Sequence, residues 1–248
     1  MKGSARKAGF SLLEAIVVVA VLAILLALAL PAMQSVRRVS SWTVSKMRLG
    51  ENAKLLNAYA AAHADAFPVS FLTPRGEVRS TTRAAKPRYF EQSLFWHWPV
   101  AAFAGLSPIS ASFRSGAFGG DSISKDAPAY TDFAASCAFL ADAQYWSDAT
   151  RVGPAQWRGQ RLSDVRDPSL KIMLLDFSLH REGPVIDAAG PERSLLALVD
   201  ASVREALRTQ IRDGYRWGDG PTSLQGVFHP ADIPRGTHTV NGVAGRDL

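Results

Sequence analysis

The sequence predicts an α+β fold, in which one long N-terminal helix is followed by a loop-rich globular head. An unbroken apolar run covers Ala15–Leu30, and apolar residues then recur at three- and four-residue steps, the period of a helix face. From residue 68 onward, proline and glycine recur and mark turns. Within that part, Leu170–Phe177 is a candidate buried strand.

The apolar run has the length of a membrane span. Phe10–Leu30 comprises 21 residues, and at about 1.5 Å per residue a helix of that length covers roughly 30 Å, the thickness of a bilayer core. Pro31 follows directly, where we expect the helix to end or kink because proline lacks the amide hydrogen. The sequence therefore predicts a single membrane-spanning helix.

Composition excludes several classes of protein. The net charge of +6 lies entirely within residues 1–50, and residues 51–248 carry 21 basic and 21 acidic side chains. The head therefore has no bulk attraction for nucleic acid or anionic lipid. A mean hydropathy of +0.01 excludes a polytopic membrane protein, and a single cysteine, Cys137, excludes an internal disulfide framework.

One residue of the segment Phe10–Leu30 is charged. Glu14 is a carboxylate near the start of the run, and a lone charge near the centre of a bilayer costs about 2.5–3.5 kcal/mol, with less near the interface. A simple membrane anchor has no use for it. An ionisable residue in a spanning segment therefore predicts a function and a partner.

The residues around Glu14 carry a resemblance. The segment Gly9–Glu14 reads Gly-Phe-Ser-Leu-Leu-Glu, and the short leader before it is basic. This pattern resembles the class III signal of type IV pilins and type II secretion pseudopilins. The resemblance implies that a prepilin peptidase cuts between Gly9 and Phe10 and methylates the new amine of Phe10. It also places a helix-kinking proline at Pro31.

The resemblance gives Glu14 a role in assembly. In a filament of packed apolar helices, a buried carboxylate is tolerated only when it is paired. We expect its partner to be the methylated amine of Phe10 on a neighbouring subunit, at a helix N-terminus. The implied partners are prepilin peptidase, other pilin or pseudopilin subunits, and inner-membrane lipid before assembly.

Two other interpretations of the N-terminus stay open. A secretory signal peptide could be cut at Ala27-Leu28-Ala29, and a plain signal anchor would not be cut. Basic residues follow the span at Arg37, Arg38, Lys46 and Arg48, so the positive-inside rule does not orient it. Recognition of the leader must place the head outside the cytoplasm.

The resemblance also implies a division of the chain. We expect a leader at 1–9, a helix at 10–67 with a transmembrane and an amphipathic half, and a periplasmic or extracellular head at 68–248 that contains an antiparallel β-sheet. Apolar positions indicate a helix over about 10–65. Gly50 should bend or loosen it, and Pro68 should end it.

A second resemblance concerns the head. Phe67-Pro68, Asp164–Asp176 and Leu198–Val203 resemble segments of pilin-like proteins with a processing-associated His–spacer–Asp-Gly motif, a group abundant in planctomycete-type bacteria. There the last segment forms a hairpin around an Asp-Gly pair, whereas this chain has Asp200-Ala201. Four-residue apolar steps over 194–212 favour a helix instead, so both readings stay open, with the hairpin preferred.

The head offers no convincing catalytic or metal constellation. Its histidines lack a metal-binding spacing, and Cys137 has no identifiable basic partner. Asp213-Gly214 and Asp219-Gly220 could wrap a calcium ion, but paired turns explain them better. We expect no catalytic residue, no metal and no cofactor. The histidines of the chain are His63, His97, His180, His229 and His238.

These observations predict a non-enzymatic filament subunit of a type IV pilus-like or type II secretion system. One alternative is a minor tip pilin that binds a ligand or DNA through residues 75–98, where basic and aromatic side chains alternate. We expect a core cluster beside a solvated loop there, and no nucleic acid. The other alternative is a membrane-tethered envelope enzyme.

Overall fold

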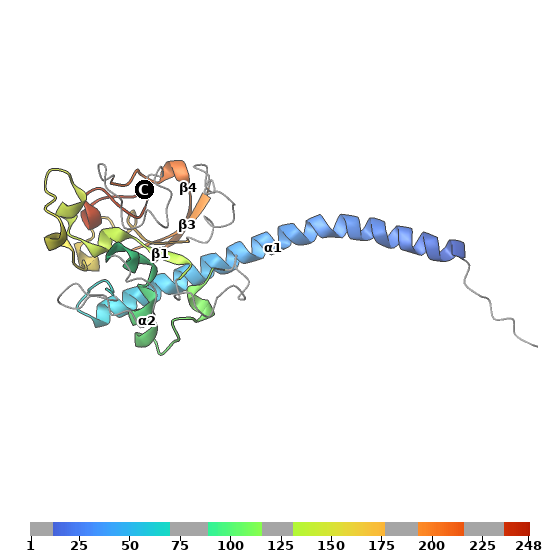
Figure 1. Cartoon of the computed structure of the whole chain (residues 1–248), viewed down its shortest axis with the longest axis horizontal. Coiled ribbons are helices and arrows are strands. Elements are labelled where there is room, and N and C mark those ends of the chain that lie inside the picture. Colours follow the sequence, from blue (N-terminus) through green and yellow to red (C-terminus); the bar gives the residue numbers. More distant parts are fainter. Residues whose placement is uncertain (1–11, 70–88, 116–130, 177–192, 216–235) are drawn as a thin grey trace, which may run out of the picture. The chain divides into compact units, whose positions relative to one another are not determined.

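The computed structural model describes residues 12–69, 89–115, 131–176, 193–215 and 236–248 (Figure 1). The chain divides into two compact units, Met1–Ser41 and Trp42–Leu248. One helix, α1 (Leu12–Ala62), contributes to both. The second unit also contains a short helix, α2 (His97–Phe103), several 3-10 turns and a four-stranded sheet.

Helix α1 is 51 residues long and continues through Pro31, as the single helix expected over about 10–65 requires. The helix therefore does not end at this proline, and a kink there stays a prediction. The helix stops three residues earlier than the apolar pattern indicates. There His63 Nδ1 lies 2.8 Å from the Tyr59 carbonyl oxygen, and the Asp65 amide donates to the Ala60 carbonyl. Ala64 and Asp65 have φ angles of +54° and +64°, so a left-handed turn ends the helix.

One face of α1 enters the core of the second unit. Leu49, Ala53, Leu56 and Ala60 are each 0% exposed, and their spacing of four, three and four residues is that of a helix face. Gly50 does not interrupt the helix. A Cβ atom at Gly50 would lie 3.1 Å from Val203 Cγ2, so glycine allows the helix to approach the sheet closely.

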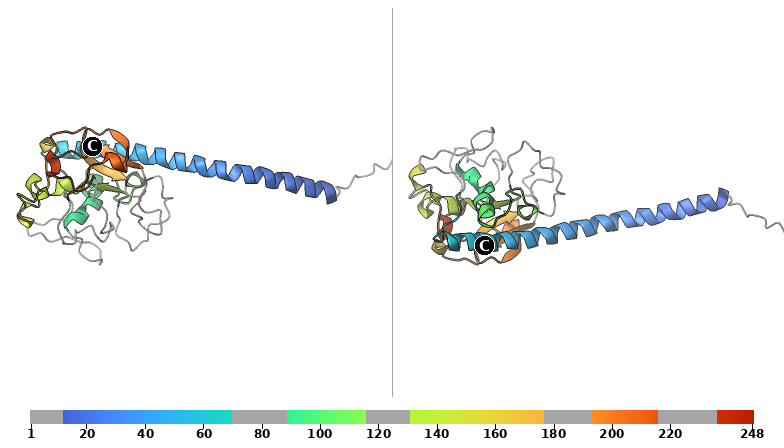
Figure 2. Two further views of the ribbon diagram at one scale, coloured as in Figure 1. Left: turned by 90° about the horizontal axis from the view of Figure 1, so that it is seen from above. Right: turned by 90° about the horizontal axis from the view of Figure 1, so that it is seen from below.

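The sheet is antiparallel, with its strands in sequence order. It consists of β1 (Phe133–Ala135), β2 (Ile172–Asp176), β3 (Arg193–Leu198) and β4 (Val203–Leu207). The expected strand at Leu170–Phe177 is confirmed as β2. Figure 2 shows β3 and β4 beside α1, and the Asn57 side chain of α1 donates to the Val199 carbonyl at 2.9 Å.

Both faces of the sheet are buried at β3. Leu195 and Ala197 of β3 belong to the apolar cluster that contains the α1 seam, whereas Leu196 and Leu198 belong to a second cluster with Phe95. Because successive strand residues point to opposite faces, this division shows packing on each side. It also explains why β3 has a continuous apolar sequence rather than alternating polar and apolar residues.

The segment that could be a helix or a hairpin is a hairpin. Strands β3 and β4 pair with Leu196 opposite Arg204, and the turn is closed by the Ala201 amide, which donates to the Leu198 carbonyl at 2.9 Å. Ala201 has a φ of +64°. An alanine therefore occupies a left-handed position that glycine adopts without strain.

We predict that Ala201→Gly raises the free energy of unfolding by about 0.5–1 kcal/mol. Relief of left-handed strain is worth about 1–2 kcal/mol, and the loss of a half-buried methyl group offsets part of it. Urea unfolding of the detergent-solubilised protein measures the change.

The matched control is Ala61→Gly. Ala61 is exposed in the last turn of α1 and has no positive φ, so the same substitution should lower the free energy of unfolding by up to about 1 kcal/mol. Equal losses of stability in both variants would show that Ala201 carries no relievable strain.

Candidate functional site

The N-terminal signal lies mostly outside the described residues. Gly9 and Phe10 precede the first described position, and Glu14 and Pro31 are described only as backbone of α1. Their expected roles in cleavage, methylation, assembly and kinking therefore remain predictions. The feature that can be described is the first half of the helix that carries them.

That half of α1 exposes apolar side chains on all sides. The large aliphatic residues between Ile16 and Leu30 are 48–69% exposed, including the four consecutive residues Ile16–Val19. Four consecutive helical residues point around the whole circumference, so no face is covered. A search of the described residues finds no helix long and apolar enough to cross a membrane. An apolar surface of this extent marks a site of interaction.

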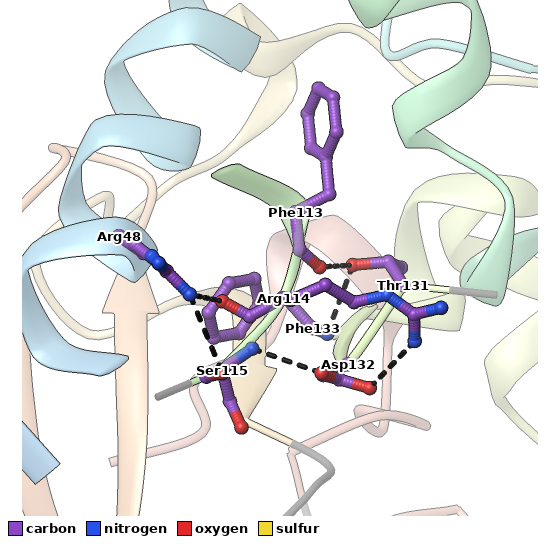
Figure 3. A network of polar contacts seen from close by, with 7 residues as sticks. All are labelled: Arg48, Phe113, Arg114, Ser115, Thr131, Asp132 and Phe133. Carbon is purple, nitrogen blue, oxygen red and sulfur yellow. Dashed lines mark hydrogen bonds and ion pairs between the residues drawn. The ribbon is translucent and has the colours of Figure 1, made fainter. Parts of the chain in front are cut away.

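A polar network fixes the next part of α1 within the second unit (Figure 3). Arg48 Nη1 donates to the Arg114 carbonyl at 3.1 Å, and the Ser115 carbonyl is 3.5 Å away. Asn52 Nδ2, from a side chain only 2% exposed, donates to the Ser112 carbonyl at 2.7 Å. These bonds satisfy carbonyls of an irregular segment that would otherwise lose water on burial.

The same network continues to the sheet. The Asp132 carboxylate accepts from the Ser115 amide at 3.0 Å and from Arg114 Nη1 at 3.2 Å. Thr131 Oγ1 donates to the Phe113 carbonyl and accepts from the Phe133 amide at the start of β1. Arg48 therefore connects α1 to the first strand through two short segments. Sequence reasoning missed this arrangement.

A buried ion pair lies at the start of β2. Lys171 Nζ is 3.2 Å from Asp247 Oδ2 and donates to the Gly242 carbonyl at 3.0 Å, and both charged side chains are almost completely buried. Asp247 Oδ2 also accepts from the Ile172 amide. Burial lowers the pKa of Lys171, an effect opposed by Asp247. The pair holds residues 242–247 against the sheet, and sequence reasoning did not identify it.

Among the residues that the structure describes, the sequence candidates for chemistry do not meet in a site. Cys137 is 0% exposed, and burial raises its pKa to about 12, so the thiol is inert. His97 and His238 are buried, whereas His63 is exposed and stacks on Tyr59 at 4.0 Å. Among the described residues, no group of histidine, cysteine or acidic side chains could hold a metal.

Phe90, Phe95 and Trp96 of the 75–98 region belong to the core, and Tyr89 and Trp98 pack against it as partly buried side chains. Phe95 is 5% and Trp96 0% exposed, and Trp96 Nε1 donates to the Phe133 carbonyl at 2.7 Å. They cannot serve as a stacking platform for nucleobases. Several other candidates lie outside the described residues. These are Arg75, Arg79, Arg83, Lys86, Arg88, His180, His229 and Asp219-Gly220.

The comparisons with known proteins agree with the prepilin-type signal expected at the N-terminus. Residues 4–30 match the family model of the prokaryotic N-terminal methylation motif, and the chain thus carries a prepilin-type signal. No curated protein and no solved structure matches the chain. Helix α1, helix α2 and the antiparallel sheet form the expected α+β pilin-like layout.

The methylation motif also indicates the class of protein, its processing and its location. It supports a type IV pilin-like or pseudopilin precursor, which implies processing by prepilin peptidase and assembly with other pilins. It also indicates a protein that is first anchored in a membrane and then assembled at the surface.

The buried His238 makes the head sensitive to acid. Burial lowers the pKa of His238 from 6.5 to about 3, so between these values the folded chain keeps the ring neutral while the unfolded chain protonates it. Stability therefore falls as the pH falls through this range, by about 1.4 kcal/mol per pH unit for this group. We predict a shallower decline for His238→Gln, measured by urea unfolding between pH 7 and 4.

The control is His63→Gln, at an exposed position. Its stability should decline with falling pH as steeply as that of the unsubstituted protein. The loss of packing against Trp146 will lower the stability of His238→Gln at every pH, so the slope and not the absolute value is compared. Equal slopes in all three proteins would contradict the attribution of the pH dependence to His238.

Proposed function

We propose that this protein is a structural subunit of a type IV pilus-like or type II secretion pseudopilus filament. It is cleaved by prepilin peptidase between Gly9 and Phe10 and assembles through packing of its N-terminal helix. The observation that carries the proposal is the half of α1 with apolar side chains exposed on every side, and its residues 16–30 lie within the methylation motif at residues 4–30. Such a helix requires apolar surroundings, and neighbouring helices of the same kind supply them.

Before assembly, the proposed surroundings are inner-membrane lipid. The 21-residue run Phe10–Leu30 matches the roughly 30 Å thickness of a bilayer core. Residues 1–9 form the leader and remain in the cytoplasm, residues 10–67 form the helix, and the head at 68–248 lies in the periplasm. In the second unit, Leu49, Ala53 and Leu56 of α1 belong to the apolar cluster of the head. This supports a head that packs on the C-terminal part of the helix.

Glu14 favours the helix in a filament over the helix in lipid. Within a helical bundle, its carboxylate requires a cation, and the methylated amine of Phe10 on a neighbouring subunit provides one at a helix N-terminus. The charge that is unfavourable in lipid thus becomes favourable in the filament. This change in pairing drives subunits from the membrane into the polymer.

The test of processing is mass spectrometry of the mature protein from its native membranes. We predict a chain that begins at Phe10 with a methyl group on its α-amine, because the motif at residues 4–30 directs both steps. A Gly9→Val variant, which blocks the cleavage site, should keep residues 1–9. A mature chain that starts near Ala29 would instead indicate an ordinary signal peptide and refute the proposal.

The test of assembly is Glu14→Ala. The variant leaves the Phe10 amine of a neighbour buried without a partner, which costs about 3–5 kcal/mol. We predict normal membrane insertion and a loss of filament incorporation of tenfold or more, measured by immunoblotting of sheared filaments and membranes. Leu22→Ala, which removes an exposed apolar side chain from the same helix, should retain incorporation. If Glu14→Ala assembles normally, the proposed role of Glu14 is wrong.

A further inference from the structure

The segment 236–248 and the start of β2 are held together by several contacts in the second unit. The Asp247 amide donates to the Leu170 carbonyl at 3.0 Å. The Arg246 guanidinium binds the Asp167 carboxylate twice, through Nε at 2.7 Å and Nη2 at 3.1 Å. The main chain at Asp247 is therefore fixed beside the start of β2.

The amine of Lys171 has three polar neighbours in this contact. Nζ lies 3.2 Å from Asp247 Oδ2, and it donates to the Gly242 carbonyl at 3.0 Å and to Thr239 Oγ1. An ammonium group uses all three. A neutral amine has two N–H bonds and a lone pair, so it can keep Gly242 and Thr239 as acceptors while its lone pair faces the carboxyl group. The site thus suits a lysine nucleophile as well as an ion pair.

The Asp247 carboxyl group receives a hydrogen bond on each oxygen. Oδ2 accepts from the Ile172 amide at 2.9 Å, and Oδ1 accepts from the Thr239 hydroxyl at 2.5 Å. Such donors stabilise the negative charge that develops on the oxygens when a nucleophile adds to the carboxyl carbon. Because Thr239 Oγ1 also accepts from Nζ, one hydroxyl connects the amine to Oδ1 and can transfer protons between them.

The surroundings of the pair exclude water. The side chains of Lys171 and Asp247 are 0% and 2% exposed, Thr239 is 3% exposed, and the centroid of the Phe139 ring lies 5.9 Å from Nζ. Burial, although opposed by Asp247, lowers the pKa of Lys171, which brings the neutral amine within reach. A site without water also favours a reaction that releases water and protects its product from hydrolysis.

We propose that Lys171 and Asp247 join through an isopeptide bond that the folded head forms by itself. The lone pair of Nζ forms a bond to Cγ of Asp247, while two protons of the ammonium group pass through Thr239 Oγ1 to Oδ1. The bond between Cγ and Oδ1 breaks, and Oδ1 leaves as water. The third proton stays on the new amide nitrogen, which donates to the Gly242 carbonyl, and Oδ2 remains as the amide oxygen beside the Ile172 amide.

The bond connects two distant parts of the chain covalently. Lys171 and Asp247 are 76 positions apart, so the bond closes a long loop and restricts the unfolded chain. The segment 236–248 then stays attached to β2 when the hydrogen bonds around it are lost. The inference is independent of the proposed filament function, because it rests only on residues of the second unit.

The test is tryptic peptide mapping by mass spectrometry of the full-length protein, purified in detergent from its native membranes. Trypsin cuts after a free lysine and not after an acylated one. We expect, in most chains, the peptide 167–181 joined through Lys171 to the peptide that begins at Asp247, about 18 Da lighter than the two together. A cut after Lys171 with separate peptides in most chains shows an ion pair only and overturns the proposal. A bond from Lys171 to a different residue overturns Asp247 as the partner.

Two variants identify the reacting groups. Asp247→Asn offers ammonia in place of water as the leaving group, so it should give the same cross-linked peptide with a loss of about 17 Da. An identical peptide mass from both proteins identifies the bond as an amide. Lys171→Met removes the nucleophile and should give no cross-link, whereas a cross-link at Asp247 in this variant overturns the proposal.

The role of the hydroxyl is tested by Thr239→Val. This variant keeps Lys171 and Asp247 but removes the path for protons, so the cross-linked fraction should fall at least fivefold. The matched control is Thr150→Val, at an exposed position whose hydroxyl donates to the Gln144 carbonyl, and it should leave the fraction unchanged. The fractions are compared in samples that show a cooperative urea transition. An unchanged fraction in Thr239→Val overturns the transfer of protons through Thr239.

Discussion

The packing of one face of α1 into the head is the interaction on which the rest of the structure depends. Leu49, Ala53, Leu56 and Ala60 are completely buried, and the cluster that contains the first three also includes residues of β2 and β3. The C-terminal part of the helix is thereby a part of the core of the second unit. Its remaining surface stays available to other molecules, because a helix presents only one face to a core.

Small residues make this close packing possible. Gly50 lets β4 approach α1, and the alanines of the seam leave room for the buried strands. The hairpin lies near α1 through the bond from Asn57 to the Val199 carbonyl. The positive φ of Ala201 in that turn is therefore held by a structure that fixes the hairpin from both sides, as strained residues in general require.

The sequence was informative where a feature depends on periodicity or on contiguous residues. It placed the end of α1 within three residues, identified β2 and favoured the β3–β4 hairpin. Pro31 and Gly50 both lie inside the continuous helix α1, and residue propensity alone does not show what surrounds a helix. Sequence reasoning also missed Arg48 and Asn52, whose partners are backbone carbonyls of residues 112–115. Any residue type supplies a carbonyl, so such contacts leave no pattern in the sequence.

The two halves of α1 differ in what they contact. Among the described residues, Trp42 is the first to contact the apolar clusters, as a partly buried side chain, and Leu49 is the first fully buried member. The aliphatic residues between Ile16 and Leu30 therefore add nothing to the stability of the head, while their exposure to water is unfavourable. Their presence is explained only by surroundings outside the chain. The same reasoning extends to Glu14, for which we propose a neighbouring amine as the partner.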